Sequence, residues 1–308
     1  MTINRRDMVG GMLATGLAFG ASGCIPPDQS PAGRLVATLR IIEAEADGTL
    51  GAELFDISNN SSIGLNQTRR FGHCSSFKLS LAALILARHA AGIDNADRHV
   101  RWSEDDLMFV SPFTTERLSQ GATLRELAEF TQKYSDNAAA NILLREVGGP
   151  AALTQFWRDL GDNVSRLDRT EPALNNVPPT EIRDTTTPMT MARTVAKLTY
   201  GEVLPEEQRA LLRQWMVDTR TGRRRVRAGL PEDWRAGDKT GTSIWPGMGS
   251  LYVDIGFVES TERGPFTFAT YFRTREAKDG MDPAAEAALA KVGEVLTTYC
   301  EKDDFLPF

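Results

Sequence analysis

The sequence has few of the residues that bind metal ions. Among its 308 residues there are only three cysteines and three histidines. They are Cys24, Cys74, Cys300, His73, His89 and His99. None of them falls into a CxxC, HExxH or similar spacing, so the sequence predicts neither a metal site nor metal-dependent chemistry. An enzyme of this composition would depend on carboxylates, lysines and hydroxyl groups, and we expect no cofactor.

The sequence also lacks an excess of positive charge. It has 35 basic and 41 acidic residues and a formal net charge of −6. An acidic protein does not attract phosphate backbones, and only the segment 223–227 is locally basic, so we expect no nucleic-acid partner. With 41% hydrophobic and 25% charged residues, the chain is typical of a globular protein with one large domain or two modest ones.

The N-terminal segment 8–27 has no charge and follows Arg5 and Arg6. A basic start before a short apolar stretch indicates an export signal, and five glycines make a membrane span unconvincing. The arginine pair resembles a twin-arginine signal, and the residues before Cys24 resemble a lipoprotein cleavage box. Two outcomes stay open, a lipid anchor on Cys24 or ordinary cleavage nearby. Both predict a protein that works in the periplasm.

Hydrophobic patterns predict helices and strands in an unusual order. Helical spacing begins at Pro31, and two strand-like runs follow at 50–57 and 63–71. The segment 75–91 is almost wholly apolar and predicts a buried helix. Residues 102–160 and 188–217 read as helices, with an irregular stretch between them. The last elements are strands at 235–242, 251–258 and 266–273 and then a helix after Pro283.

This order predicts one sheet built from both ends of the chain. Neither strand group is large enough to stand alone, so the central helices are expected to form an inserted domain. The predicted organisation is an export segment at 1–29, a discontinuous α/β domain at 30–70 and 220–308, and an all-α domain at 71–219.

Ser75 and Lys78 lie three residues apart at the start of the predicted buried helix. This spacing puts both on one helix face, where a lysine in apolar surroundings can act as the base for a serine nucleophile. Composition gives about 0.4 such pairs by chance, so the pair alone is a weak signal.

Two further motifs follow in order, Ser135-Asp136-Asn137 and Lys239-Thr240-Gly241. All three motifs together are expected by chance at about 10⁻³, so the set is specific. Two similar triplets are set aside here: Ser58-Asn59-Asn60 lies in a turn ahead of the nucleophile, and no strand pattern follows Arg220-Thr221-Gly222.

These three motifs resemble those of the penicillin-recognising serine enzymes, the β-lactamases and penicillin-binding proteins. The segment 166–184 further resembles the Ω-loop of class A β-lactamases. Glu171 and Asn175 match the residues that hold the hydrolytic water there, and Arg169 and Asp184 match the ion pair that closes the loop. Thr170 departs from the family, which usually has an aromatic residue at this position. The resemblance covers residues from about 30 to 302.

The resemblance implies a fold and a set of roles. The fold is α/β (α+β), with a five-stranded antiparallel sheet flanked by the terminal helices and an inserted helical domain. Ser75, Lys78, Ser135, Glu171 and Lys239 are the implied catalytic residues. The implied substrate-binding residues are Asn137, Asn175, Thr240, Gly241, Thr242 and Arg225. Whether Lys78 or Glu171 is the acylation base stays open, as does a reading of Arg225 as a solvated surface arginine.

Three other residues are expected to pack in the protein and not to act in catalysis: Cys74, His73 and Cys300, which lies on the last predicted helix and has no matching partner in the family. Some carbapenem-hydrolysing relatives join the residue at Cys74 to a second cysteine, but this chain has Ser243 at that place, so Cys74 is expected to be a buried free thiol. His73 is expected to pack near the nucleophile and not to act in catalysis.

The predicted function is hydrolysis of β-lactam antibiotics, namely penicillins and cephalosporins, which confers antibiotic resistance. Glu171 carries this reading, because turnover of a stable acyl-enzyme needs a carboxylate that activates water. The alternatives are a D-Ala-D-Ala peptidase or penicillin-binding protein, a glutaminase on the same fold, and a non-hydrolytic sensor lipoprotein. A monomer with a small-molecule partner is expected.

Overall fold

The computed structural model describes residues 28–261 and 263–301, and the predictions for Arg5, Arg6 and Cys24 lie outside them. Within this part of the chain, no helix is both long enough and apolar enough to cross a membrane. The first helix, α1 (Pro31–Glu45), begins where Ser30 accepts a hydrogen bond from the Gly33 amide at 3.0 Å. Its buried face is the predicted apolar stripe of Leu35, Leu39 and Ile42.

One five-stranded antiparallel sheet joins the two ends of the chain, as predicted. Its strand order is β2-β1-β9-β8-β7. The strands are β1 (Gly48–Asp56), β2 (Ser61–Leu65), β7 (Arg235–Ser243), β8 (Leu251–Glu259) and β9 (Pro265–Thr274). The central pairing aligns Gly48 with Thr274 and Asp56 with Phe266. The early and late strands therefore depend on each other for their backbone hydrogen bonds.

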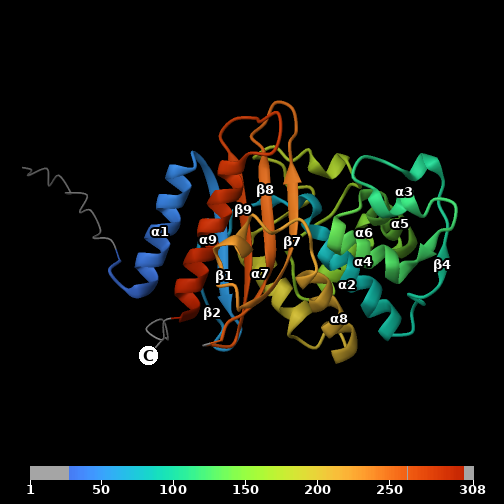
Figure 1. Cartoon of the computed structure of the whole chain (residues 1–308), viewed down its shortest axis with the longest axis horizontal. Helices are drawn as coiled ribbons and strands as arrows, with labels where there is room; N and C mark the ends of the chain where they lie inside the picture. Colours follow the sequence, from blue (N-terminus) through green and yellow to red (C-terminus); the bar gives the residue numbers. More distant parts are fainter. Residues whose placement is uncertain (1–27, 262, 302–308) are drawn as a thin grey trace, which may run out of the picture.

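Helices cover both faces of this sheet (Figure 1). On one face α1 packs beside α9 (Pro283–Glu301), and α1 contacts β1 while α9 contacts β9. On the other face α7 (Pro188–Thr199) lies against β1, β8 and β9, and α8 (Glu206–Val217) lies against β7. Each face has its own hydrophobic cluster.

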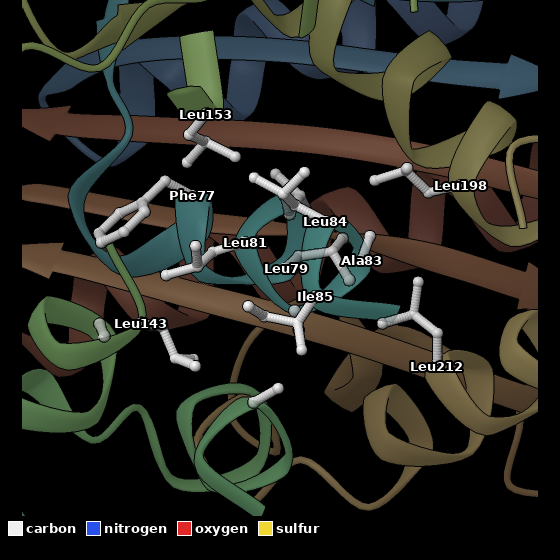
Figure 2. Close-up of a cluster of buried hydrophobic side chains, with 14 of the residues drawn as sticks. Phe77, Leu79, Leu81, Ala83, Leu84, Ile85, Leu143, Leu153, Leu198 and Leu212 are labelled. Carbon is white, nitrogen blue, oxygen red and sulfur yellow. The ribbon is translucent and has the colours of Figure 1, made fainter. Parts of the chain in front are cut away.

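The predicted buried helix is α2 (Phe77–Ala90), and every residue from Phe77 to Leu86 is buried. In Figure 2 its side chains point outward in several directions, toward Leu143, Leu153, Leu198 and Leu212 of the surrounding helices. These surrounding helices are α4 (Leu124–Tyr134), α5 (Asn137–Val147), α6 (Pro150–Asp159), α7 and α8, and the short α3 (Pro112–Glu116) packs on α4 and α5. A helix that is apolar on all sides can be stable only inside such a ring.

Several predicted elements are shorter in the structure than the sequence pattern indicates. The run 63–71 was predicted as one strand, but β2 ends at Leu65, because Asn66 adopts a left-handed conformation with φ 49°. Phe71 and Gly72 then form β3, which pairs with β6 (Thr185–Thr186). Within 102–160 a strand β5 (Ala122–Thr123) pairs with β4 (His99–Val100) and interrupts the helices.

Candidate active site

Ser75 lies in a tight turn between the sheet and α2. The turn is a 3-10 helix, η1 (Cys74–Ser76). Its first residue, Cys74, has φ 47°, an uncommon conformation for a residue with a side chain. Strand β7 approaches this turn closely. A Cβ atom on Gly241 would lie 2.9 Å from the Ser75 nitrogen, so only glycine fits there. The nucleophile candidate is therefore held against the edge strand of the sheet.

The Lys78 ammonium group lies among oxygen atoms and not in the apolar surroundings that the sequence predicted. Its Nζ contacts Ser75 Oγ at 3.0 Å, Ser135 O at 3.0 Å and Ser135 Oγ at 3.4 Å. It also contacts Asn137 Oδ1 at 2.5 Å and Glu171 Oε1 at 3.1 Å. Burial lowers the pKa of Lys78, while the Glu171 carboxylate opposes this shift. The helix pattern of α2 could not predict these oxygens, which come from distant segments.

The second and third motifs meet at one hydroxyl group. Ser135 has a left-handed conformation with φ 61°, and its Oγ accepts a hydrogen bond from Lys239 Nζ at 3.1 Å. Lys239 is fully buried on β7, and burial together with the Lys78 charge holds its pKa well below the usual range. Ser135 Oγ therefore lies between the side-chain nitrogens of two lysines, each of which can supply a proton as the ammonium ion or accept one as the neutral amine.

Glu171 reaches the nucleophile from the irregular segment 166–184. Its Oε1 accepts a hydrogen bond from Ser75 Oγ at 3.2 Å, and its Oε2 accepts one from Asn175 Nδ2 at 2.7 Å. Asn141 of α5 holds the Glu171 backbone from both sides, at 3.0 Å to the amide and 2.9 Å to the carbonyl. Asn175 Oδ1 is buried and has no hydrogen-bond partner among the described residues.

The ends of this segment are tied together by Asp184. Its carboxylate accepts hydrogen bonds from the amides of Asp168 and Arg169 and from Arg169 Nε, the last at 2.5 Å. Asp184 is fully buried, so this ion pair forms within the protein and not on its surface. Thr170, the departure from the family pattern, is exposed and does not take part.

Arg225 is buried beneath β7, so its reading as a solvated arginine is wrong. Its Nη1 donates to the carbonyls of Gly241 and Val253, and its Nη2 donates to Thr242 Oγ1 at 2.6 Å. Its Nε lies 3.6 Å from Glu286 Oε1. Since a guanidinium group only donates, Thr242 Oγ1 must accept, and its own hydrogen is left for a ligand.

Thr221 contributes to the site, although its triplet Arg220-Thr221-Gly222 was not counted among the motifs. Thr221 Oγ1 lies 2.5 Å from Thr240 Oγ1, and both residues line the same cavity. No sequence pattern marks this contact, because Thr221 lies in a loop with no strand pattern after it. Ser243, the residue after Thr242 on β7, donates to the Asn175 carbonyl at 2.8 Å and joins the strand to the Glu171 segment.

A cavity of about 350 Å³ brings the predicted residues together. Its lining includes Ser75, Ser135, Asn137, Glu171, Asn175, Arg225, Thr240, Gly241 and Thr242. Four further residues of this lining were missed from the sequence: Phe109, Val110, Met281 and Glu286. The first three are more than half exposed and form an apolar rim. They come from loops that only the fold brings together, so no local motif marks them.

Cys74, Cys300 and His73 are buried, as predicted. Both cysteines are free thiols, and burial raises the pKa of Cys74 to about 12. The His73 ring stacks on Trp157 with ring centres 4.8 Å apart, and burial lowers the pKa of His73 to about 4. His73 is therefore neutral near pH 7 and packs beside the nucleophile turn.

Comparison with known proteins identifies the family. The profile of the β-lactamase enzyme family matches residues 34–300. β-Lactamase OXY-2 of Klebsiella oxytoca is 38% identical over 249 residues, which cover 80% of this chain and 84% of that protein. The carbapenem-hydrolysing β-lactamase KPC of the same organism is 38% identical over 251 residues, 82% of this chain and 85% of that protein.

Solved structures give the class. An ancestral class A β-lactamase superposes with a TM-score of 0.81 at 40% identity, covering 86% of this chain and 99% of that one. A β-lactamase from Burkholderia vietnamiensis gives a TM-score of 0.81 at 38% identity, covering 86% and 96%. The chain belongs to the class A β-lactamases. The predicted family and the predicted fold of this class A β-lactamase are thereby confirmed.

Proposed function

We propose that this class A β-lactamase hydrolyses β-lactam antibiotics through a covalent acyl-enzyme on Ser75, and that this activity confers resistance. The observation that carries the proposal is the buried Glu171 carboxylate, 3.2 Å from Ser75 Oγ and hydrogen-bonded to Asn175. A carboxylate in this position can activate water against the ester of Ser75, and turnover of a β-lactam acyl-enzyme requires this step.

In the first half of the reaction, Ser75 Oγ attacks the carbonyl carbon of the β-lactam ring. Its proton passes to Lys78 or to Glu171, and both groups lie within hydrogen-bond distance of Ser75 Oγ. The amides of Ser75 and Thr242 would stabilise the oxyanion. When the ring C–N bond breaks, Ser135 gives its hydroxyl proton to the nitrogen. Lys78 and Lys239 flank Ser135 Oγ and support this transfer.

In the second half, a water molecule between Glu171 and Asn175 attacks the ester carbon. One of its protons goes to Glu171, and the other is held by Asn175 Oδ1, the buried atom without a protein partner. The C–O bond to Ser75 then breaks, and the proton that Glu171 took from the water passes to Ser75 Oγ, which restores both groups. Since Asn175 Nδ2 already donates to Glu171, the amide orientation is set for this role.

The substrate carboxylate would bind beside β7, where the donors are concentrated. Lys239 supplies positive charge, and Ser135, Thr240 and Thr242 supply hydroxyl groups. Arg225 acts through Thr242, whose hydrogen it leaves available. Gly241 permits the close approach of strand and substrate.

Asn137 would bind the amide of the substrate side chain. Its Nδ2 donates one hydrogen to the Phe109 carbonyl at 3.0 Å, and the second hydrogen remains for the substrate.

The proposal also covers the location of the enzyme, its oligomeric state and its cofactor requirement. It includes export to the periplasm by the N-terminal signal, with twin-arginine transport and Cys24 lipidation as its finer form. It also includes action as a monomer on a small molecule, without a metal or cofactor. The signal motifs of residues 1–27 and the donor set of the cavity support these parts.

A chromogenic cephalosporin tests the proposal directly. Purified enzyme should turn it over many times, and Glu171→Ala should instead accumulate an intact-mass adduct on Ser75, with deacylation slower by about 10²–10⁴. Ser75→Ala should form no adduct. Glu181→Ala, a glutamate of the same loop that pairs with Arg183 at the surface, is the matched control and should keep the wild-type rate.

Each rival function predicts a different result in this experiment. A peptidase or a sensor would show a stable adduct on the wild-type protein without turnover, and a glutaminase would ignore the cephalosporin. Wild-type turnover by Glu171→Ala would remove Glu171 from its assigned role.

A further inference from the structure

A second cavity lies away from Ser75, between α7 and the end of β1. Its volume is about 560 Å³, within the range of small-molecule sites, and it shares no lining residue with the active-site cavity. Its walls are the segment 161–164, α7, and Phe55, Ile57 and Asn60 from β1 and the turn after it. In Figure 1 this region lies on the face of the sheet covered by α7.

The floor of this cavity is apolar apart from one carboxylate. Phe55 and Ala196 are buried there, and Val164 and Met189 add partly buried apolar surface. Asp162 is only 4% exposed. Its oxygens already accept hydrogen bonds from the amides of residues 164 and 165 and from Thr194 Oγ1. A ligand therefore meets an apolar floor whose only charge is negative and already hydrogen-bonded.

The rim of the cavity is positively charged. Arg193 and Lys197 are one turn apart on α7, and both line the cavity. Arg193 Nη1 donates to Glu53 Oε1 at 2.8 Å and to the Met189 carbonyl at 3.1 Å, which leaves Nη2 and Nε for another acceptor. Lys197 Nζ donates to the Leu160 carbonyl at 2.5 Å and keeps two hydrogens.

The positions of these charges fix the orientation of a ligand. An anionic group would be repelled by Asp162 at the floor and attracted by Arg193 and Lys197 at the rim. An apolar body would pack against Phe55 and Ala196. The Arg193 guanidinium carbon lies 5.0 Å from the centre of the Phe55 ring, so the ring and the anionic group of a ligand would bind side by side. Thr190 adds a rim hydroxyl that accepts from Thr187 Oγ1 and so has its own hydrogen left to donate.

We propose that this cavity is a binding site for a small aryl carboxylate, with its ring on the Phe55 floor and its carboxylate between Arg193 and Lys197. The site lies where both ends of the Glu171 segment meet, since residues 161–164 precede that segment and α7 follows it. It does not depend on the chemistry at Ser75.

Calorimetric titration with 2-naphthoate tests the proposal on the full-length protein. We expect saturable binding with one ligand per chain. The uncharged analogue 2-naphthol, which has the same ring body, should bind at least about fivefold more weakly because it lacks the charge. Absence of saturable naphthoate binding, or equal affinity for both compounds, would overturn the proposal.

Two variants locate the site. Lys197→Met, at an exposed position, should weaken naphthoate binding about fivefold, whereas Lys291→Met, an exposed lysine on α9, should leave it unchanged. Thr190→Trp should fill the rim and abolish binding while turnover of a chromogenic cephalosporin continues, which shows that the variant is folded. Wild-type affinity in both Lys197→Met and Thr190→Trp would place naphthoate elsewhere and refute the assignment.

Discussion

The Lys78 ammonium group is held by oxygens from three separate segments, and the balance between burial and charge sets its protonation. Burial favours the neutral amine, and the Glu171 carboxylate 3.1 Å away favours the ammonium ion. Because burial is the larger effect, Lys78 gives up its proton more readily than a solvent-exposed lysine does. This is the property that a proton relay between Ser75 and Ser135 requires.

Removing the charge of Glu171 should shift this balance in a known direction. In Glu171→Gln we expect the pKa of Lys78 to fall below its wild-type value, since desolvation remains and the attraction is lost. The chain has only seven lysines, so ¹³C NMR of the lysine Cε resonances can follow this titration. Glu181→Gln is the control. An unchanged Lys78 pKa in Glu171→Gln would show that Glu171 does not influence this amine.

Arg225 connects β7, which lines the active-site cavity, to the neighbouring strand β8. We expect Arg225→Met to lower the free energy of unfolding by about 3 kcal/mol, because two buried carbonyls and Glu286 lose their partner. It should also raise KM for a carboxylate substrate. Arg224→Met, at the exposed neighbouring position, should change stability by less than about 0.5 kcal/mol. Urea unfolding and steady-state kinetics measure both effects, and equal behaviour of the two variants would contradict this role.

Sequence motifs were enough to name the residues of the site but not their surroundings. Ser75, Ser135 and Lys239 are recognisable because their neighbours along the chain form fixed triplets. The contact of Thr221 with Thr240 and the support of Glu171 by Asn141 depend on loops and helices that are distant in sequence. Their residue types are common, so no local pattern could mark them.

At the scale of elements, the segment 166–184 is fixed at its neck by one buried carboxylate. Asp184 satisfies two backbone amides and a guanidinium group at once. The catalytic glutamate extends from a loop, yet it is held by side chains of the helical part and by Asp184. This explains how an irregular segment can position a general base.

Asp184→Ala should therefore affect both stability and deacylation. We expect a loss of about 3 kcal/mol in the free energy of unfolding and a slower deacylation, with acyl-enzyme accumulating in the steady state. Arg183→Ala breaks only a surface pair with Glu181 and should change stability by less than about 1 kcal/mol. Intact-mass measurement during turnover and urea unfolding check this prediction. Wild-type deacylation by Asp184→Ala would show that the loop keeps its geometry without this carboxylate.

The element boundaries show where periodicity alone is insufficient. The alternation in 63–71 continues through Asn66, but Asn66 turns the chain and donates its side-chain amide to the Leu50 carbonyl. The strand therefore stops, and Phe71 pairs with Thr186, just after the end of the Glu171 segment. Turn formation by a single asparagine overrides the strand pattern there.

At the scale of the whole molecule, His73 links global stability to pH. Its pKa is about 4 in the folded protein, against 6.5 for an exposed histidine, because burial disfavours the charged ring. Asp162 and Asp184 favour that charge and Arg70 opposes it, but burial dominates. The unfolded chain therefore binds a proton that the folded protein does not, and stability falls as the pH drops below about 6.5.

We expect this histidine to remove about 2 kcal/mol of stability between pH 7.5 and pH 5. His73→Leu lacks the titrating ring, so its unfolding free energy should fall by about that much less over the same range. Urea unfolding of both proteins at the two pH values gives the comparison. If the unfolding free energies of the two proteins changed equally with pH, His73 would take up its proton as readily in the folded state as in the unfolded state.

The pairing of β1 with β9 has a consequence for how the protein is made. The aligned residues Gly48 and Thr274 are more than two hundred positions apart, so a ribosome finishes most of the chain before β1 can gain this partner. Partial chains leave a strand edge open, and such edges invite pairing with other chains. The sheet can therefore close only after the C-terminal strands are complete, and a truncation before β9 should yield aggregated protein.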